Sequence, residues 1–372
     1  MIALAAGYQH FADGAPFAEI ALRHPSVKEV YFPWIDEPSG RPRLGYEEED
    51  DPAELSAALR RDLERLRGAG IRLDLLLNAN CYGEQAMSQS LDAHVREIVG
   101  TLDSWGCRPE VCTTASPFVA RVLKSAFPEI EVRASVNMRL TTLQAFRYLA
   151  PLFDSYYIGR DIQRNLETVK RFSDWCRANG KKLCLLANSG CLRNCPWQTF
   201  HDNLIAHSDA AMKVANVKGW CPHLCWTLYK DRANFPEILK ATWVRPEDVF
   251  RYEGLVDVVK LATRQHANPD MVIGAYERRS YDGNLLDLFE PGFSPSFFPK
   301  YIDNAAFPPD WFEKTGVCPR ECTACGYCEQ VFKTVCRTIG EAWEGRAAAR
   351  PDSAPLREGR ALARPQRGAT NG

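Results

Sequence analysis

The sequence predicts a (β/α)8 TIM-type barrel, and two features carry that prediction: eight short apolar segments, and the helical stretches that separate them. The segments are mostly continuous runs of aliphatic and β-branched residues, as expected for parallel strands that are buried on both faces. They lie at residues 2–8, 27–34, 71–78, 109–115, 131–137, 154–159, 181–188 and 257–264. Such regular alternation of strands and helices is typical of the closed barrel.

Helical periodicity fills the segments between these strands. Residues 51–70 repeat leucine at three- and four-residue spacing and end at glycine, a common helix stop signal. The same pattern recurs at 90–106, 116–127, 165–180 and 245–254. A doubly wound open sheet is the alternative fold, but no GxGxxG follows the first strand, which disfavours a dinucleotide-binding sheet.

The spacing of the strands is uneven in one place, between the seventh and the eighth. The stretch 189–244 carries four cysteines and is too long for a bare loop. Insertions of this kind build the site at the carboxyl-terminal face of a barrel. We therefore expect a barrel over 1–290 with 189–244 as its insertion, and a cysteine module over 291–340. A disordered tail rich in Ala, Arg, Pro and Gly is expected over 347–372.

Composition limits the functional classes. The chain has 372 residues, 45% of them hydrophobic and 25% charged, enough to bury an ordinary core without disulfide staples. A net charge of −1 gives no overall sign of a nucleic-acid or membrane partner. We find no secretory signal and no apolar run of about 18 residues, so we expect a cytoplasmic protein with no membrane partner. Thiols stay reduced in that compartment, so the 14 cysteines indicate metal rather than disulfides.

Two CxxxC pairs lie in the insertion: Cys191 with Cys195, and Cys221 with Cys225. Four thiolates from two short turns can surround one metal centre. Zinc sites more often use tighter CxxC knuckles, whereas iron–sulfur clusters are larger and tolerate looser spacing. We favour an iron–sulfur cluster here, with zinc and an absence of metal as the alternatives.

A second group of cysteines reads CxxxCxxCxxC, at Cys318, Cys322, Cys325 and Cys328. The compact CxxCxxC part is similar to ferredoxin ligation, in which one loop supplies three thiolates to a cube. We expect a 4Fe–4S cluster, and zinc is again the alternative. Cys107, Cys112, Cys176 and Cys184 are expected to be small buried hydrophobic residues. The sequence leaves open the roles of Cys81 and Cys336.

Three stretches together resemble the collagenase-like peptidase superfamily, peptidase family U32. They are KGWCPHLCWTLY at 218–229, NSGCLRNCPWQTFH at 188–201 and VDVVKLATR at 256–264. The resemblance covers about residues 1–265. Trp226 stands where the family signature usually has arginine, so the chain resembles a divergent member, and the C-terminal cysteine module is an addition to the family core.

That resemblance implies a chemistry. Several members are oxygen-independent hydroxylases of tRNA, rRNA or ubiquinone precursors, which hold a 4Fe–4S cluster through four cysteines and can use prephenate as oxygen donor. By this resemblance, Cys191, Cys195, Cys221 and Cys225 would hold a cluster in the barrel. The implied partners are a small-molecule or nucleotide substrate and an electron donor or a paired family member. The C-terminal group would suit electron delivery to that cluster.

Polar residues at the predicted strand ends complete the candidate site. The candidates are Asn78, Asn137, Arg160, Arg264 and, beside the cysteine insertion, His201. Arginine suits a carboxylate, so Arg160 and Arg264 are candidates to hold an acidic substrate or donor. Salt bridges at the barrel rim and helix caps are the structural alternatives for the arginines and asparagines.

Two other functions remain as alternatives to a redox enzyme. A peptidase needs an activated nucleophile or a metal-bound water, and the chain has neither HExxH nor GxSxG, although a Cys–His dyad stays open. A zinc-stabilised scaffold or electron carrier would account for the C-terminal cysteines but not for the barrel.

Overall fold

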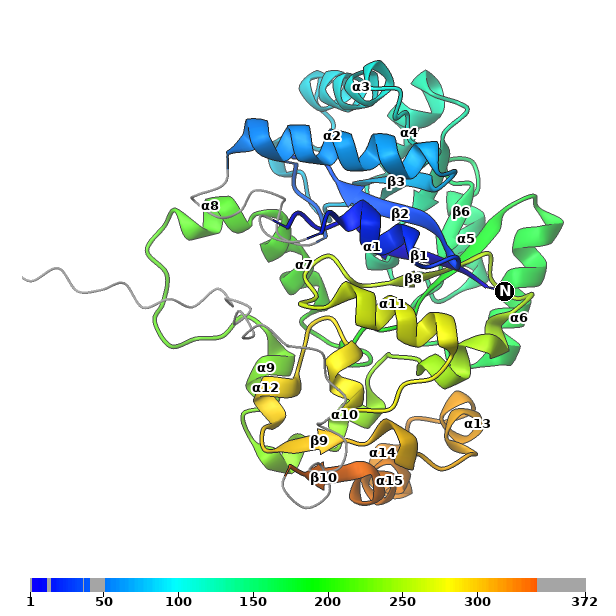
Figure 1. The fold of residues 1–372 in the computed structure, drawn as a ribbon, viewed down its shortest axis with the longest axis vertical. Helices are drawn as coiled ribbons and strands as arrows, with labels where there is room; N and C mark the ends of the chain where they lie inside the picture. The colour runs from blue at the N-terminus through cyan, green and yellow to red at the C-terminus, as the bar shows by residue number, and fades with distance from the viewer. Residues whose placement is uncertain (1, 12–14, 36, 41–50, 340–372) are drawn as a thin grey trace, which may run out of the picture.

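The computed structural model describes residues 2–11, 15–35, 37–40 and 51–339. The tail expected over 347–372 lies outside this part of the chain. Within it, eight strands form a closed barrel in sequence order, with β8 pairing back to β1 and every pair parallel (Figure 1). The predicted (β/α)8 fold is therefore confirmed.

Each of the eight predicted segments forms one barrel strand. The strands are β1 (Ala3–Gly7), β2 (Val27–Pro33), β3 (Arg72–Leu77), β4 (Val111–Thr114), β5 (Glu131–Ala134), β6 (Ser155–Tyr157), β7 (Lys182–Leu186) and β8 (Val258–Leu261). Most of their residues are buried, because helices cover the outer face and side chains fill the lumen.

Helices lie outside the strands in the first six repeats. They are α1 (Phe17–Leu22), α2 (Pro52–Gly68), η1 (Gly83–Gln85), α3 (Gln89–Ser104), α4 (Pro117–Ala126), η2 (Val136–Met138), α5 (Leu143–Leu149) and α6 (Leu166–Ala178). Side-chain caps fix where several begin: the Ser88 hydroxyl accepts a hydrogen bond from the Leu91 N–H at 2.9 Å. The helix predicted over 245–254 is a 3-10 helix, η4 (Pro246–Tyr252), rather than an α-helix.

The insertion after β7 is a chain of short helices. These are α7 (Gln198–Ala206), α8 (Ser208–Met212), α9 (Leu224–Leu228), η3 (Arg232–Asn234) and α10 (Glu237–Lys240). Beyond β8 follow α11 (Pro269–Arg278), η5 (Leu285–Leu288), α12 (Ser294–Phe297), β9 (Lys300–Ile302), η6 (Asn304–Ala306), α13 (Trp311–Gly316), α14 (Cys322–Cys325), α15 (Tyr327–Val335) and β10 (Cys336–Thr338).

Aromatic packing joins the C-terminal elements to the end of the insertion. The buried ring of Trp243 stacks on Phe289 at 5.5 Å and on Trp311 at 5.9 Å between centroids. Strands β9 and β10 pair antiparallel, with Cys336 opposite Ile302, so Cys336 lies in a small ladder (Figure 1). The cysteine loop between α13 and α15 is thereby held against the rest of the protein.

The barrel lumen is more charged than the aliphatic interior usual for this fold. Arg133 on β5 pairs with Glu29 at 3.0 Å and approaches Asp74 Oδ2 at 3.5 Å. The Lys260 ammonium lies 3.7 Å from the centroid of the Tyr31 ring, a cation–π contact. Burial lowers the pKa of Lys260 to about 8 and raises the pKa of Asp74 to about 6.

No helix in the described part of the chain combines the length and the apolar character needed to span a lipid bilayer.

Candidate functional site

The loop that carries Cys191 and Cys195 leaves β7 at the carboxyl-terminal end of the barrel. Two hydrogen bonds fix the backbone of this loop. At Cys191, the Thr242 N–H donates to the cysteine carbonyl at 3.1 Å. Just before Cys195, the Asn194 N–H donates to the Asp161 carboxylate at 2.7 Å. Asn194 has a φ of 53°, a left-handed conformation that asparagine tolerates better than most residues. The loop is therefore a turn whose conformation is fixed by hydrogen bonds to the rest of the protein.

Three of the four cysteines predicted as barrel ligands act on one another electrostatically. Burial raises the pKa of Cys225 to about 12, and the neighbouring Cys191 and Cys195 add to that rise. The fourth, Cys221, directs its thiol to the His223 carbonyl at 3.6 Å. As they stand, no three His, Cys, Asp or Glu side chains of the described residues converge as ligands of a single ion.

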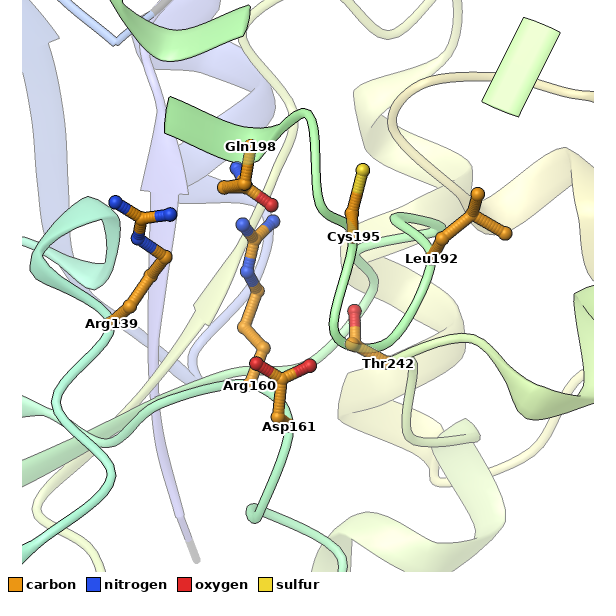
Figure 2. Close-up of a pocket in the computed structure, with 7 residues that line it drawn as sticks. All are labelled: Arg139, Arg160, Asp161, Leu192, Cys195, Gln198 and Thr242. Atoms are coloured by element: carbon orange, nitrogen blue, oxygen red, sulfur yellow. The ribbon is translucent and has the colours of Figure 1, made fainter. Parts of the chain in front are cut away.

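Arg160 lies beside the first cysteine pair. It follows β6, is 8% exposed, and donates to the Ser189 hydroxyl at 2.9 Å. Burial raises the pKa of Cys195 while the charge of Arg160 lowers it, so the guanidinium and the thiol are neighbours. Figure 2 shows Arg139, Arg160, Gln198 and Cys195 around one small pocket, with the two arginine side chains running roughly parallel.

Three other predicted site residues gather around Ser39–Gly40, the segment beyond β2. Arg264 donates to the Ser39 hydroxyl at 3.0 Å, and the Gly40 N–H donates to the Asn78 side-chain oxygen at 3.0 Å. A Cβ added to Gly40 would lie 2.7 Å from the Asn137 amide nitrogen. Asn78 thus holds this segment rather than capping a helix.

His201 lies on α7, close to the second cysteine pair. Its ring meets that of His223 edge to face, with 4.5 Å between centroids, and His223 follows Cys221 by two residues. The predicted residues therefore form three neighbouring groups: Arg160 with Cys195, His201 with His223, and Arg264 with the two asparagines at Ser39–Gly40.

The four C-terminal cysteines line one cavity of about 270 Å³. Cys322 and Cys325 are exposed, whereas Cys318 and Cys328 are partly buried. Every cysteine of the chain is in the free thiol form.

Sequence reasoning missed Arg139 and Asp161, which both line the pocket of Figure 2. Arg139 has φ 52° and ψ 47°, and a left-handed arginine is uncommon enough to suggest a functional constraint. Nothing in the local sequence signals that conformation. Asp161 directly follows Arg160 at a strand end and could have been found by the same reasoning.

Comparison with known proteins gives one sequence relative and several similar barrels. No family model matches the chain. An uncharacterized protease of Methanocaldococcus jannaschii is 24% identical over 264 residues, which are 70% of this chain and 76% of that protein. The structure of a U32 peptidase covers 70% of this chain and 92% of its own at 16% identity, with a TM-score of 0.48. The structure of an endo-beta-1,4-mannanase from Thermotoga petrophila covers 56% of this chain and 65% of its own at 10% identity, with a TM-score of 0.36.

The similarity to the archaeal protease spans most of both chains. The chain is thus similar, over most of its length, to a protein named an uncharacterized protease.

Proposed function

We propose that the protein is an iron–sulfur-dependent redox enzyme, similar to the oxygen-independent hydroxylases of the superfamily that it resembles, acting on an anionic small molecule or nucleotide. The observation that carries the proposal is the gathering of Cys191, Cys195 and Cys225 beside Arg160 at the barrel mouth. This donor set consists of thiols, the ligands of iron–sulfur clusters.

A cluster and a single ion make different demands on their ligands. A zinc ion draws its four ligands to about 2.0–2.3 Å, whereas each thiolate of a 4Fe–4S cube binds a different iron. Among the described residues no three His, Cys, Asp or Glu side chains surround one ion position, and a cluster would not require them to do so. Cys191, Cys195, Cys221 and Cys225 would hold the cluster, which would supply one-electron chemistry at the mouth.

The protein's own residues would bind and orient the substrate there. Arg160 is held in place by Ser189, and Arg139 lines the same pocket, where it makes no ion pair with another described residue. Two guanidinium groups that line one pocket favour a carboxylate or phosphate. Arg264, placed by Ser39, is a third cation of the mouth.

Anaerobic purification of the full chain tests the proposal. We expect a brown protein with iron and acid-labile sulfide in equal amounts, and a paired Cys191→Ala, Cys195→Ala variant that loses about four iron atoms per chain. Retention of all iron in that variant would show that these cysteines are not ligands.

The name of the archaeal relative makes proteolysis the second candidate. Hydrolysis of peptides by the iron-free chain, abolished by the same paired variant, would favour a peptidase over a redox enzyme.

A further inference from the structure

The C-terminal cysteines lie around a cavity separate from the pocket at the barrel mouth. Cys318 lies in a loop, Cys322 and Cys325 are the first and last residues of α14, and Cys328 lies in the first turn of α15, yet all four line the same 270 Å³ space. Gly326, with φ 62°, reverses the chain between α14 and α15 and also lines the cavity. A residue with a Cβ would be strained in that conformation, so the turn depends on glycine.

The cavity is lined by charged side chains as well as thiols. Lys240 and Glu329 both line it and pair with each other at 2.6 Å, Lys314 lines it and pairs with Asp310 at 2.7 Å, and the Arg320 N–H donates to the Cys318 sulfur at 3.3 Å. Hydrogen bonds from the backbone to cysteine sulfur and nearby positive charge stabilise iron–sulfur clusters and set their potential. The volume is several times the roughly 30 Å³ that one water occupies in the liquid.

The two cysteine loops are joined through Asp161. Its carboxylate accepts from the Asn194 N–H in the barrel loop, and its backbone carbonyl accepts from the Arg320 guanidinium in the C-terminal loop. One residue therefore fixes the position of each loop relative to the other.

Arg193 lies in the space between the two loops. Its Nε is buried without a hydrogen-bond partner among the described residues, although buried guanidinium groups are normally satisfied. The Arg193 guanidinium lies within electrostatic range of Arg320, Cys318 and Cys328, so this side chain of the barrel loop is close to the C-terminal cysteine loop.

A second connection runs through Arg164. This guanidinium stacks on Trp243 at 4.6 Å and donates to the carbonyls of Ala241 and Trp243, while its charge acts on Cys328. Thr242, between those two residues, bonds the Cys191 carbonyl through its N–H and its hydroxyl. Hydrogen bonds thus link Arg164, whose charge acts on Cys328, to the first barrel cysteine.

We propose that the C-terminal cysteine loop holds a second iron–sulfur centre and is the electron input site of the protein. Its donor would be a one-electron carrier that docks at Cys322 and Cys325, and its acceptor the barrel cysteine site. The assignment of the barrel cysteine site as electron acceptor rests on the proposed function, whereas the assignment of the C-terminal iron site does not.

The step moves one electron and no atoms. The reduced carrier loses one electron and is oxidised, and the centre held by the four C-terminal cysteines is reduced by one. That electron then passes inward, on the side of Cys328, to the centre held at Cys191, which is reduced while the C-terminal centre is reoxidised.

Iron content tests the site itself. The full chain, purified without oxygen, should hold about eight iron atoms, and a paired Cys322→Ser, Cys325→Ser variant about four. Cys336→Ser is the matched control, because Cys336 lies in the β9–β10 ladder and does not line the cavity; it should keep all eight. Stoichiometric zinc in the parent, or full iron in the paired variant, overturns the proposal.

Reduction kinetics test the direction of electron flow. Reduced methyl viologen serves as the one-electron probe, and rapid-freeze electron paramagnetic resonance follows the barrel centre. The paired Cys322→Ser, Cys325→Ser variant should reduce that centre at least tenfold more slowly than the Cys336→Ser control. An equal rate overturns the input role.

The paired Cys191→Ala, Cys195→Ala variant separates the two proposals. If it keeps about four iron atoms that titrate as one cluster, both sites stand. If it keeps all the iron of the parent while the Cys322→Ser, Cys325→Ser variant is iron-free, the barrel site and the relay fail but the C-terminal site holds.

Arg193 gives a readout that does not depend on removing a ligand. Positive charge beside a centre stabilises its reduced form, so Arg193→Gln should lower the midpoint potential of the C-terminal centre. A tenfold change in the reduced-to-oxidised ratio corresponds to about 59 mV for a one-electron couple. Arg193→Lys should restore the potential, and Arg96→Gln, on the exposed face of α3, should leave it unchanged. Equal potentials in the Gln and Lys variants overturn the role of this charge.

Discussion

The Asp161 carboxylate accepts a hydrogen bond from the Asn194 N–H at 2.7 Å, and this contact supports the left-handed conformation of Asn194 in the barrel cysteine loop. Because the Asp161 carbonyl also binds Arg320, the same residue connects the two cysteine groups of the chain. Asp161, beyond the end of β6, is therefore one of the residues that set the spatial relationship between the two groups.

Replacing Asp161 should loosen the barrel loop. A hydrogen bond to a charged group contributes about 1.5–3 kcal/mol, so Asp161→Ala should leave Asn194 in an unsupported conformation. We expect faster trypsin cleavage after Arg193 in the iron-free chain, measured by mass spectrometry. Asp161→Asn, which keeps an acceptor oxygen, should be cleaved at nearly the rate of the parent. Identical cleavage of all three proteins would mean that Asp161 does not hold the loop.

Asp74 should give the protein a pH-dependent stability. Burial raises its pKa to about 6 in the folded state, above the value of about 3.9 for a free aspartate, so the folded protein binds more protons between these values. The free energy of unfolding should therefore fall as pH rises from about 4 to 6. Urea unfolding across this range should show a shallower fall in Asp74→Asn, whose side chain keeps an oxygen for the Thr113 hydroxyl. Parallel pH profiles would contradict the assignment.

Lys260 should be essential to the folded state. Its ammonium is buried among Asp74, Glu29 and Arg133, and removing one member of a buried charge network typically costs about 3–5 kcal/mol. Lys260→Met should lower the free energy of unfolding by about that amount in urea titrations. Lys170→Met, which breaks only an exposed pair with Asp174, should change it by no more than about 0.5 kcal/mol. A similar small loss in both variants would show that the lumen charges are independent of one another.

Arg160 should determine affinity for an anionic ligand. Loss of a charged hydrogen bond costs about 1.5–3 kcal/mol, which is about a 10- to 100-fold loss of affinity. Calorimetric titration with prephenate should show this loss in Arg160→Gln and a smaller one in Arg160→Lys. Arg171→Gln, on the surface of α6, is the control and should bind as the parent does. Equal affinities in Arg160→Gln and the parent would exclude Arg160 from the binding site.

Much of the barrel was predictable because its strands are continuous apolar runs separated by periodic helices. Helices α1 and α5 were not, since six or seven residues are too few to show a helical period. The proximity of Cys318, Cys322, Cys325 and Cys328 follows from their close spacing within one short segment, whereas the cavity between them was not predicted. The contacts of Asp161 and the charge network around Lys260 join residues that are distant in sequence, and no local pattern reveals such pairings.

Mössbauer spectroscopy of the full chain, produced with ⁵⁷Fe and kept free of oxygen, tests the central claim most directly. We predict that the iron is present as thiolate-bound 4Fe–4S clusters and that the paired Cys191→Ala, Cys195→Ala variant loses the barrel component of the spectrum. A chain that folds and functions with no iron, or whose iron spectrum is unchanged in that variant, would contradict it.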